Sequence, residues 1–325
     1  LPVLPSSFDS KQKRMRFAPL LFLAIALFTV LHGNAQRYMP EFAIEDSQKL
    51  FEKAEKAYVN ESYERSAKLY EDLMAVEGAN YELLFNQLTS LVHTTDTAAI
   101  ERTFSKLIQS PFLDCNYLSM SQDFKEIKYR AIFNQWQTAL RACSEKEKKY
   151  LSENQVQLPE VRTQLLWMKF KDVESDVKVV QKIHYGGHEK LSYDSLKEMR
   201  AKIYSENFAQ LLEFTNKHGW LGKSLVGKDG CEAAWQVAQH ATHQPVAQAK
   251  LLQTLKNAVD KGEAELKHYA HLFDQVCANY RRPQRYGTLR WKNPETGKWE
   301  LYPVEDAAAV NDLRKEAGLP PLKDL

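Results

Sequence analysis

The sequence predicts a mainly α-helical protein with one small β-hairpin near its C-terminus. Three observations lead to this fold class. Apolar residues recur at helical spacing through most of the chain after residue 48. Short polar or glycine-containing turns separate these periodic segments. Only residues 286–306 place two aromatic-rich segments around a turn, formed by Asn293-Pro294-Glu295-Thr296-Gly297.

Residues 1–35 are predicted to be upstream sequence and a signal peptide. A basic residue follows Met15, and a largely apolar run extends from Leu20 to Leu31. This run is shorter than a membrane-spanning helix and is followed by small residues, as in secretory signal peptides. We therefore expect translation from Met15, cleavage after Ala35 and a periplasmic or secreted protein. The alternative is an N-terminal membrane anchor; no cysteine follows the run, so a lipoprotein is not expected.

The segment Asn34-Ala35-Gln36 also resembles the cleavage region of Bacteroidetes signal peptides.

Removal of the leader changes the charge of the chain. The full chain has 44 basic and 42 acidic residues; without the four basic residues and one acidic residue of the leader, 40 and 41 remain, a net charge of −1. A near-neutral chain lacks the broad positive field of nucleic-acid-binding proteins, so no nucleic acid is expected as a partner. No later apolar segment approaches the length of a membrane span, so no membrane association is expected after cleavage.

Residues 36–143 are predicted to form helical-hairpin repeats. Between Lys49 and Met74, two helical patterns flank the polar turn 60–62. The pattern resembles the tetratricopeptide repeat, and a shift by its period of about 34 residues finds a degenerate second copy. A generic array of helical hairpins explains the same spacing. Such hairpins need neighbours to bury their apolar faces, so we expect a closing helix over 123–143 and a docking surface for a protein or peptide partner. The repeat positions are Tyr63, Ser66 and Tyr70, then Ile100 and Phe104.

Residues 144–325 are predicted to form a second domain, because the strongly charged stretch 143–157 separates the two halves. The four cysteines fit no metal-binding spacing. In an exported protein they can pair within each half, as 115–143 and 231–277, and four buried thiols are the equal alternative. No metal and no cofactor are predicted. Helices are expected over 158–183, 192–219, 233–245, 246–262, 264–280 and 305–318.

Five segments of this half resemble, in the same order, the bacterial family called domain of unknown function 6624. The similarity covers Leu158 to Leu325, and it implies where a site lies but not what chemistry it performs. The family carries an acid where this chain has Thr242, and its Asp-Gln and Asp-Arg pairs are matched by Asp172-Val173 and Asp274-Gln275. The segments are HGWLGKSLVGKDG, AAWQVAQHATHQP, RPQRYGT, LYPVED and LRKEAGLPPL.

The first candidate site lies on the helix expected over 233–245. Its small apolar residues form one stripe, with Trp235 and Gln239 on a flank and His240 and His243 on the back. A solvated face would more commonly carry Lys and Glu. We therefore predict ligand contacts by Trp235 and Gln239 and acid–base chemistry by His240 and His243, against the alternative of structural or surface polarity. The histidines could supply two metal ligands, but no third is recognisable.

The second candidate site is the loop 284–288, where Gln284, Arg285, Tyr286 and Thr288 are predicted to bind a ligand. Because guanidinium groups bind carboxylate and phosphate, the ligand is expected to be small and anionic. The alternative is that the arginines cap a helix and pair with surface acids.

Three functions remain open. The first is an exported protein with a docking module and a polar His/Gln/Arg cleft between the two motifs. The second is a pure interaction scaffold. The third is a hydrolase or transferase with His240 or His243 as general base. No Ser, Cys or acidic residue stands in a recognisable nucleophile motif, so the sequence does not decide whether the protein is an enzyme.

Overall fold

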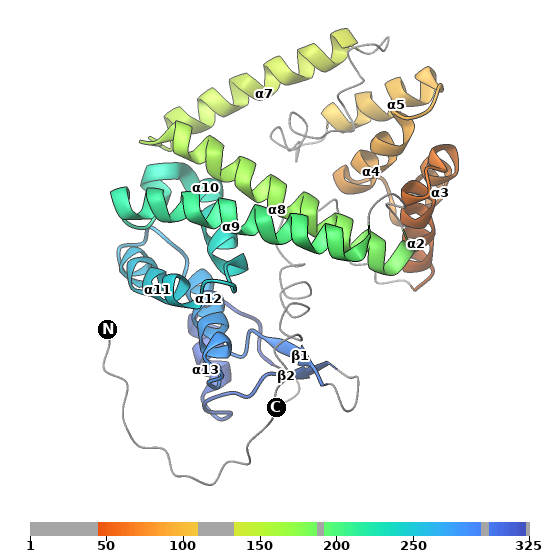
Figure 1. Ribbon diagram of the computed structural model, residues 1–325. Helices are drawn as coiled ribbons and strands as arrows, with labels where there is room; N and C mark the ends of the chain where they lie inside the picture. The colour runs from red at the N-terminus through yellow and green to blue at the C-terminus, as the bar shows by residue number, and fades with distance from the viewer. Residues whose placement is uncertain (1–44, 110–132, 187–191, 294–298, 323–325) are drawn as a thin grey trace, which may run out of the picture.

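The computed structural model describes residues 45–109, 133–186, 192–293 and 299–322. These residues form a mainly helical fold with one two-stranded antiparallel sheet near the C-terminus, which confirms the predicted fold class (Figure 1). None of the helices in these ranges is long and apolar enough to cross a membrane.

The N-terminal half consists of successive antiparallel helices, each packed against the next. Asn80 and Asp96 cap the third and fourth of these helices, because their side chains accept hydrogen bonds from the amides of Leu83 and Ala99. Ser66 is a small residue at a helix crossing, where its hydroxyl donates to the carbonyl of Ala54 at 2.9 Å. The helices are α2 (Glu45–Val59), α3 (Tyr63–Glu77), α4 (Tyr81–Leu91) and α5 (Thr97–Ile108).

Helix α7 (Phe133–Glu153) runs without interruption through the boundary predicted between residues 143 and 144. Trp136 and Cys143 of α7 pack into the N-terminal core with Phe104. Residues 110–132, which include the first part of the closing helix expected over 123–143, lie outside the described residues. The division into two domains therefore remains a prediction.

The C-terminal half contains the remaining helices and the hairpin that the sequence predicts. Pro159 and Pro245 occupy the first turns of their helices, where a missing amide costs nothing. Arg290 pairs with Leu301 across the two strands, and the hairpin turn at 294–298 is not described. The elements are α8 (Pro159–Tyr185), α9 (Tyr193–His218), α10 (Lys223–His240), α11 (Pro245–Asp260), α12 (Leu266–Asn279), β1 (Arg290–Lys292), β2 (Trp299–Leu301) and α13 (Val310–Glu316).

Helix α10 is the centre of the C-terminal half, because it contacts α8, α9, α11 and α12. Its small residues allow these neighbours to approach closely, and they pack with large side chains of α8 and α9. The back of the helix is covered as well, since Gln236 and His240 are each only 3% exposed. The small residues are Ala233, Ala234, Val237, Ala238 and Ala241; the large ones include Leu165, Met168, Phe208 and Leu211.

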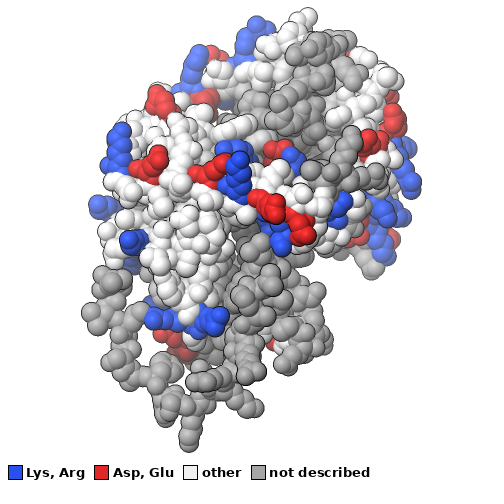
Figure 2. Space-filling model, in the orientation of Figure 1, with Lys and Arg blue, Asp and Glu red and all other residues white. Residues whose placement is uncertain are grey.

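The charged side chains of the described residues are mixed on the face drawn in Figure 2. Basic and acidic groups lie next to one another along the upper helices, and neither sign forms a continuous patch in this view. Such a face creates no strong field of one sign.

The states of the cysteines differ from both predicted arrangements. Cys231 and Cys277 are both free, so the 231–277 disulfide is wrong. Cys143 is disulfide-bonded, so four free thiols are wrong too, and Cys115 lies outside the described residues. The two free thiols have different surroundings: Cys231 lies in the main core beside the carbonyl of Glu263, and Cys277 lies near Asp274. Burial raises the pKa of Cys231 to about 11 and that of Cys277 to about 12.

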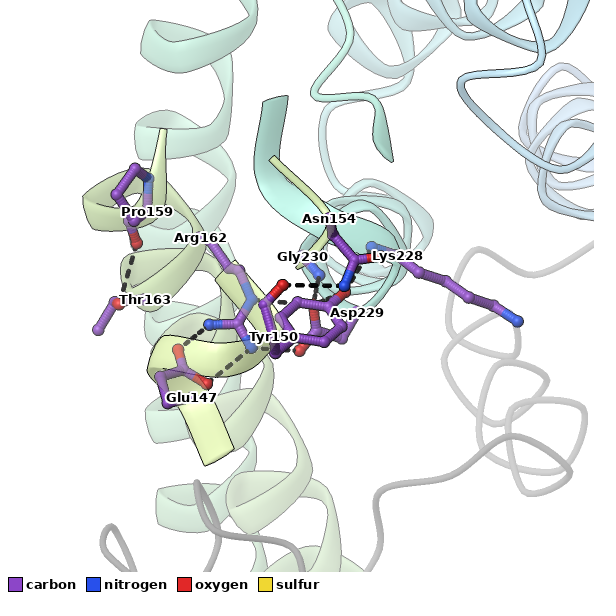
Figure 3. A network of polar contacts seen from close by, with 9 residues as sticks. All are labelled: Glu147, Tyr150, Asn154, Pro159, Arg162, Thr163, Lys228, Asp229 and Gly230. Atoms are coloured by element: carbon purple, nitrogen blue, oxygen red, sulfur yellow. Dashed lines mark hydrogen bonds and ion pairs between the residues drawn. The ribbon is translucent and has the colours of Figure 1, made fainter. Parts of the chain in front are cut away.

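One buried arginine joins three helices. Figure 3 shows the guanidinium of Arg162 (α8) between the carboxylates of Glu147 (α7) and Asp229 (α10). The hydroxyl of Tyr150 donates to Asp229 at 3.2 Å and accepts from the amide of Lys228 at 2.9 Å. Because each charge of this network has an opposite partner, we assign it a structural role.

Candidate functional site

His240 and Asp172 form a buried pair at the C-terminal end of α10. Nδ1 of His240 lies 3.2 Å from Oδ2 of Asp172, and the two residues are 3% and 0% exposed. Asn207 of α9 donates from Nδ2 to the other carboxylate oxygen of Asp172 and to the carbonyl of Met168, at 2.5 and 3.1 Å. Three helices therefore hold the imidazole in one orientation.

A second layer of polar groups supports this pair. The ring of Tyr204 stacks on the imidazole of His240 with centroids 4.7 Å apart, and its hydroxyl donates to Asp176. Arg200 pairs with the same carboxylate, Nη1 to Oδ1, at 3.3 Å. Asp172 and Asp176 lie one turn apart on α8, so both carboxylates face the same side of the helix.

The electrostatics of the pair favour a protonated imidazole. Burial lowers the pKa of His240, but the hydrogen bond with Asp172 and the nearby carboxylate of Asp176 outweigh it, so that its pKa is raised above 6.5. Burial raises the pKa of Asp172, and the contact with His240 opposes that rise. Within the described part of the chain, Nε2 of His240 makes no hydrogen bond. That nitrogen is therefore the one that could exchange a proton with a ligand.

His243 does not belong to this pair. It is exposed, its Nε2 lies 3.3 Å from the side-chain nitrogen of Gln244, and its ring meets the ring of Phe208 edge-on. Burial of part of the ring lowers its pKa, whereas the pKa of His240 is raised. The two histidines predicted to act alike therefore have opposite environments.

Trp235 and Gln239 lie on a different flank of α10, facing α12. The indole of Trp235 stacks on the imidazole of His268, with centroids 4.5 Å apart and an interplanar angle of 14°. The ring of His271 meets the same indole edge-on at 5.8 Å. The side-chain nitrogen of Gln239 donates to the carbonyl oxygen of His271 at 3.4 Å. At 100° per residue, His240 lies about 140° around the helix from Trp235, so the two groups face different neighbours.

The loop 284–288 is wrapped around Asp274 of α12. The carboxylate of Asp274 accepts hydrogen bonds from the backbone amides of Arg285, Tyr286 and Thr288 and from the hydroxyl of Thr288, at 2.8 to 3.2 Å. The side chain of Gln284 donates to the carbonyls of Leu289 and Tyr302 and accepts from the amide of Leu289. Tyr286 is buried against α12 and α13, and burial raises its pKa to about 12. These contacts are internal to the fold.

Arg285 is the most exposed of the four predicted loop residues. Its Nε donates to Glu305 at 3.0 Å, and its guanidinium lies 4.9 Å from the centre of the Phe273 ring. Phe273 is about 200° around α12 from His271, on the opposite face of that helix. The structure therefore places Arg285 away from Trp235 and Gln239. The predicted site residues fall into three groups, at His240, at Trp235 and Gln239, and in the loop 284–288, and His243 belongs to none of them. Their roles in ligand binding or catalysis remain predictions.

Several polar residues of these groups were not singled out from the sequence as site residues. On α9, Arg200, Tyr204 and Asn207 recur at helical spacing and face Asp172 and Asp176. His268, His271 and Gln275 repeat in the same way on α12. Polar side chains that recur at this spacing alongside the apolar residues of a helix face are the signal that could have indicated them. In the described residues, no group of three or more His, Cys, Asp or Glu side chains could hold a metal ion.

Comparisons with known proteins identify the family. No curated protein and no solved structure matches the chain. The model of one family, described as a family of unknown function (DUF6624), matches residues 159–325. These residues contain His240, Asp172, the Trp235 flank of α10 and the loop around Asp274. The chain thus belongs to the DUF6624 family, over the half that holds all three groups of candidate residues.

Proposed function

We propose that the C-terminal domain binds a small polar ligand at the end of α10 and exchanges a proton with it through His240. The observation that carries this proposal is the buried His240–Asp172 pair, 3.2 Å apart, which orients the ring through Nδ1 and leaves Nε2 for a ligand. A carboxylate that fixes one imidazole nitrogen raises the basicity of the ring and sets its tautomer. Asp172 is then a positioning residue.

The ligand class follows from the protonation state of His240. Because the pKa of His240 is raised, Nε2 holds a proton more readily than in a free imidazole, and in this protonated form it donates to an acceptor oxygen. Carboxylate and phosphate oxygens are the strongest such acceptors, which supports a small anion. Arg285, the residue first expected to bind the anion, is already paired with Glu305. If the domain is an enzyme, the same group serves a hydrolase or transferase as general acid or base.

We also propose that the protein is exported and that α2–α5 dock a protein or peptide partner. The leader pattern and the disulfide-bonded Cys143 support export, because disulfides persist mainly outside the cytosol. The successive packing of α2, α3, α4 and α5 supports a docking role. Mass spectrometry of the mature protein tests export: Gln36 is expected at its N-terminus, and retention of residues 1–35 would contradict it.

A ligand screen with matched histidine variants tests the His240 site. Thermal unfolding of the wild-type protein, His240→Gln, His243→Gln and Asp172→Asn is measured against a panel of small carboxylates and phosphates. We expect at least one anion to raise the Tm of the wild type and of His243→Gln but not that of His240→Gln. Asp172→Asn should weaken the effect, because the ring then loses its fixed orientation and its raised pKa.

Two results overturn this proposal. One is a panel that leaves the wild-type Tm unchanged; the other is a ligand that stabilises His240→Gln as strongly as His243→Gln. Either result would favour an interaction scaffold as the function of the domain. His243 is a suitable control because it lies three residues away, is exposed, and makes no contact with Asp172 within the described residues.

A further inference from the structure

Three buried polar atoms at the interface between α10 and α12 have no hydrogen-bond partner among the residues that the structure describes. They are Nε1 of Trp235, Oε1 of Gln239 and Nδ1 of His268. Gln239 and His268 are 4% and 7% exposed, so bulk water does not solvate these side chains. Leaving a buried polar group unpaired costs about 1–3 kcal/mol, and proteins leave few such groups.

The three atoms belong to one cluster. Trp235 and Gln239 are one turn apart on α10, so their side chains are neighbours on the helix surface. The imidazole of His268 stacks on the indole of Trp235 from the opposite helix, and Gln239 donates to the backbone of His271. Trp235 and His271 are only partly buried, so the cluster reaches the surface between α10 and α12. We call Trp235, Gln239, His268 and His271 the indole–imidazole cluster.

The cluster offers hydrogen bonds but no charge of its own. Burial lowers the pKa of His268 to about 3 and that of His271 to about 4, so both rings are neutral at pH 7. The indole N–H of Trp235 can only donate, and Oε1 of Gln239 can only accept. Nδ1 of His268 takes either role, according to the tautomer of the ring.

We propose that the indole–imidazole cluster binds an uncharged ligand that presents a carbonyl and an N–H side by side, as in the cis-amide edge of a lactam or a pyrimidine base. Trp235 donates to the carbonyl oxygen, and Gln239 accepts from the N–H. This edge satisfies the donor and the acceptor at once, whereas an anion would leave Gln239 without a donor and repel its oxygen. The site is distinct from the His240 site and goes beyond the function proposed above.

Indole NMR resonances of the full-length protein test this inference. The chain has six tryptophans, and the resonance of Trp235 is assigned as the one missing from Trp235→Phe. The probe is 2-pyrrolidinone, a small lactam. We expect it to shift the Trp235 indole N–H resonance in a saturable manner, with a millimolar Kd. N-methyl-2-pyrrolidinone lacks the N–H and acetate carries a charge; both should bind at least about tenfold more weakly, a difference of about 1.4 kcal/mol.

Variants show whether the shift arises from binding at this cluster. Gln239→Leu should abolish the saturable shift, whereas Gln253→Leu, at an exposed glutamine of α11, should retain it. His240→Gln should retain it as well, so failure at the His240 site and failure here are distinguishable. The proposal is overturned if 2-pyrrolidinone causes no saturable shift, which would mean that water alone fills the cluster, or if the N-methyl compound binds equally well. The comparison of the two lactams needs only the wild-type protein, so it holds even if Gln239→Leu fails to fold.

Discussion

Individual buried histidines differ in charge according to what surrounds them. His240 faces Asp172 and has a raised pKa, whereas His268 stacks on an indole and has a pKa lowered to about 3. Both are almost fully buried, so burial alone does not decide the protonation state. The partner of the imidazole decides it.

This contrast predicts opposite pH dependences of stability. Because the folded pKa of His240 is raised, its contribution is present below 6.5 and is lost as the pH rises through the folded pKa. Because the folded pKa of His268 is depressed to about 3, its contribution is present above 6.5 and is lost as the pH falls toward 3. Each proton accounts for at most about 1.4 kcal/mol per pH unit.

Urea unfolding at several pH values measures these slopes. His240→Gln should flatten the loss of unfolding free energy above pH 6.5, and His268→Gln should flatten the loss below it. His243→Gln, at an exposed position, should leave the alkaline slope close to that of the wild type. If His240→Gln and the wild type lose stability in parallel above pH 6.5, the pairing with Asp172 does not raise the pKa of His240 in the folded protein.

Helices are held together by buried polar contacts as well as by the apolar core. Arg162 lies on α8, and its partners Glu147 and Asp229 lie on α7 and α10. Gly227 interrupts α10 with a φ of +73°, and a Cβ at this position would lie 2.6 Å from the hydroxyl oxygen of Tyr150. The absence of a Cβ at Gly227 therefore allows Tyr150 to join the network.

Arg162→Met is predicted to destabilise the protein by about 3 kcal/mol, because two carboxylates then lose a buried guanidinium. Their partial exposure lets water compensate some of this loss, which places the cost at the lower end for a buried pair. Arg141→Met is the control, since Arg141 is an exposed arginine of α7, and it should change stability by less than about 0.5 kcal/mol. Chemical denaturation compares the two; equal losses would show that Arg162 contributes nothing through its burial.

In the whole molecule, the two halves meet along α7 and α8. Helix α2 packs against α8, where Gln181 donates to Glu55 at 3.4 Å. The matched family region begins at residue 159, which leaves out Glu147 and Tyr150. The boundary predicted at 144 keeps both residues with their partner Arg162.

A comparison of two fragments follows from this arrangement. Residues 144–325 are predicted to fold alone, because their helices share a core of their own around α10. Residues 159–325 should be less stable by about 2–3 kcal/mol, because Arg162 loses one of its two carboxylates and the contact with Tyr150. Circular dichroism with urea unfolding measures both. An unfolded 144–325 fragment would show that the N-terminal helices are an obligate part of its core, and equal stability would remove the role given to Glu147 and Tyr150.

The sequence by itself determined most of the helices, the hairpin and the family, because these depend on local signals. The helix expected over 233–245 is an exception, since α10 spans Lys223–His240 and leaves His243 outside it. Apolar spacing, glycine and proline at helix ends, and the turn after β1 all act within a few residues of the chain. For this reason α3, α8 and α12 lie close to where their patterns place them. The family motifs likewise stand in the chain as contiguous segments.

Only the tertiary structure decided what the polar residues of these helices do. Trp235, Gln239 and His240 are close in sequence, yet α12 covers the first two and α8 and α9 cover the third. The pairing of His240 with Asp172 spans 68 residues, and the loop 284–288 closes around a carboxylate rather than remaining open. Helical periodicity gives the direction of a side chain around its own helix, but its partner, and hence its charge and its role, depends on which helix packs there.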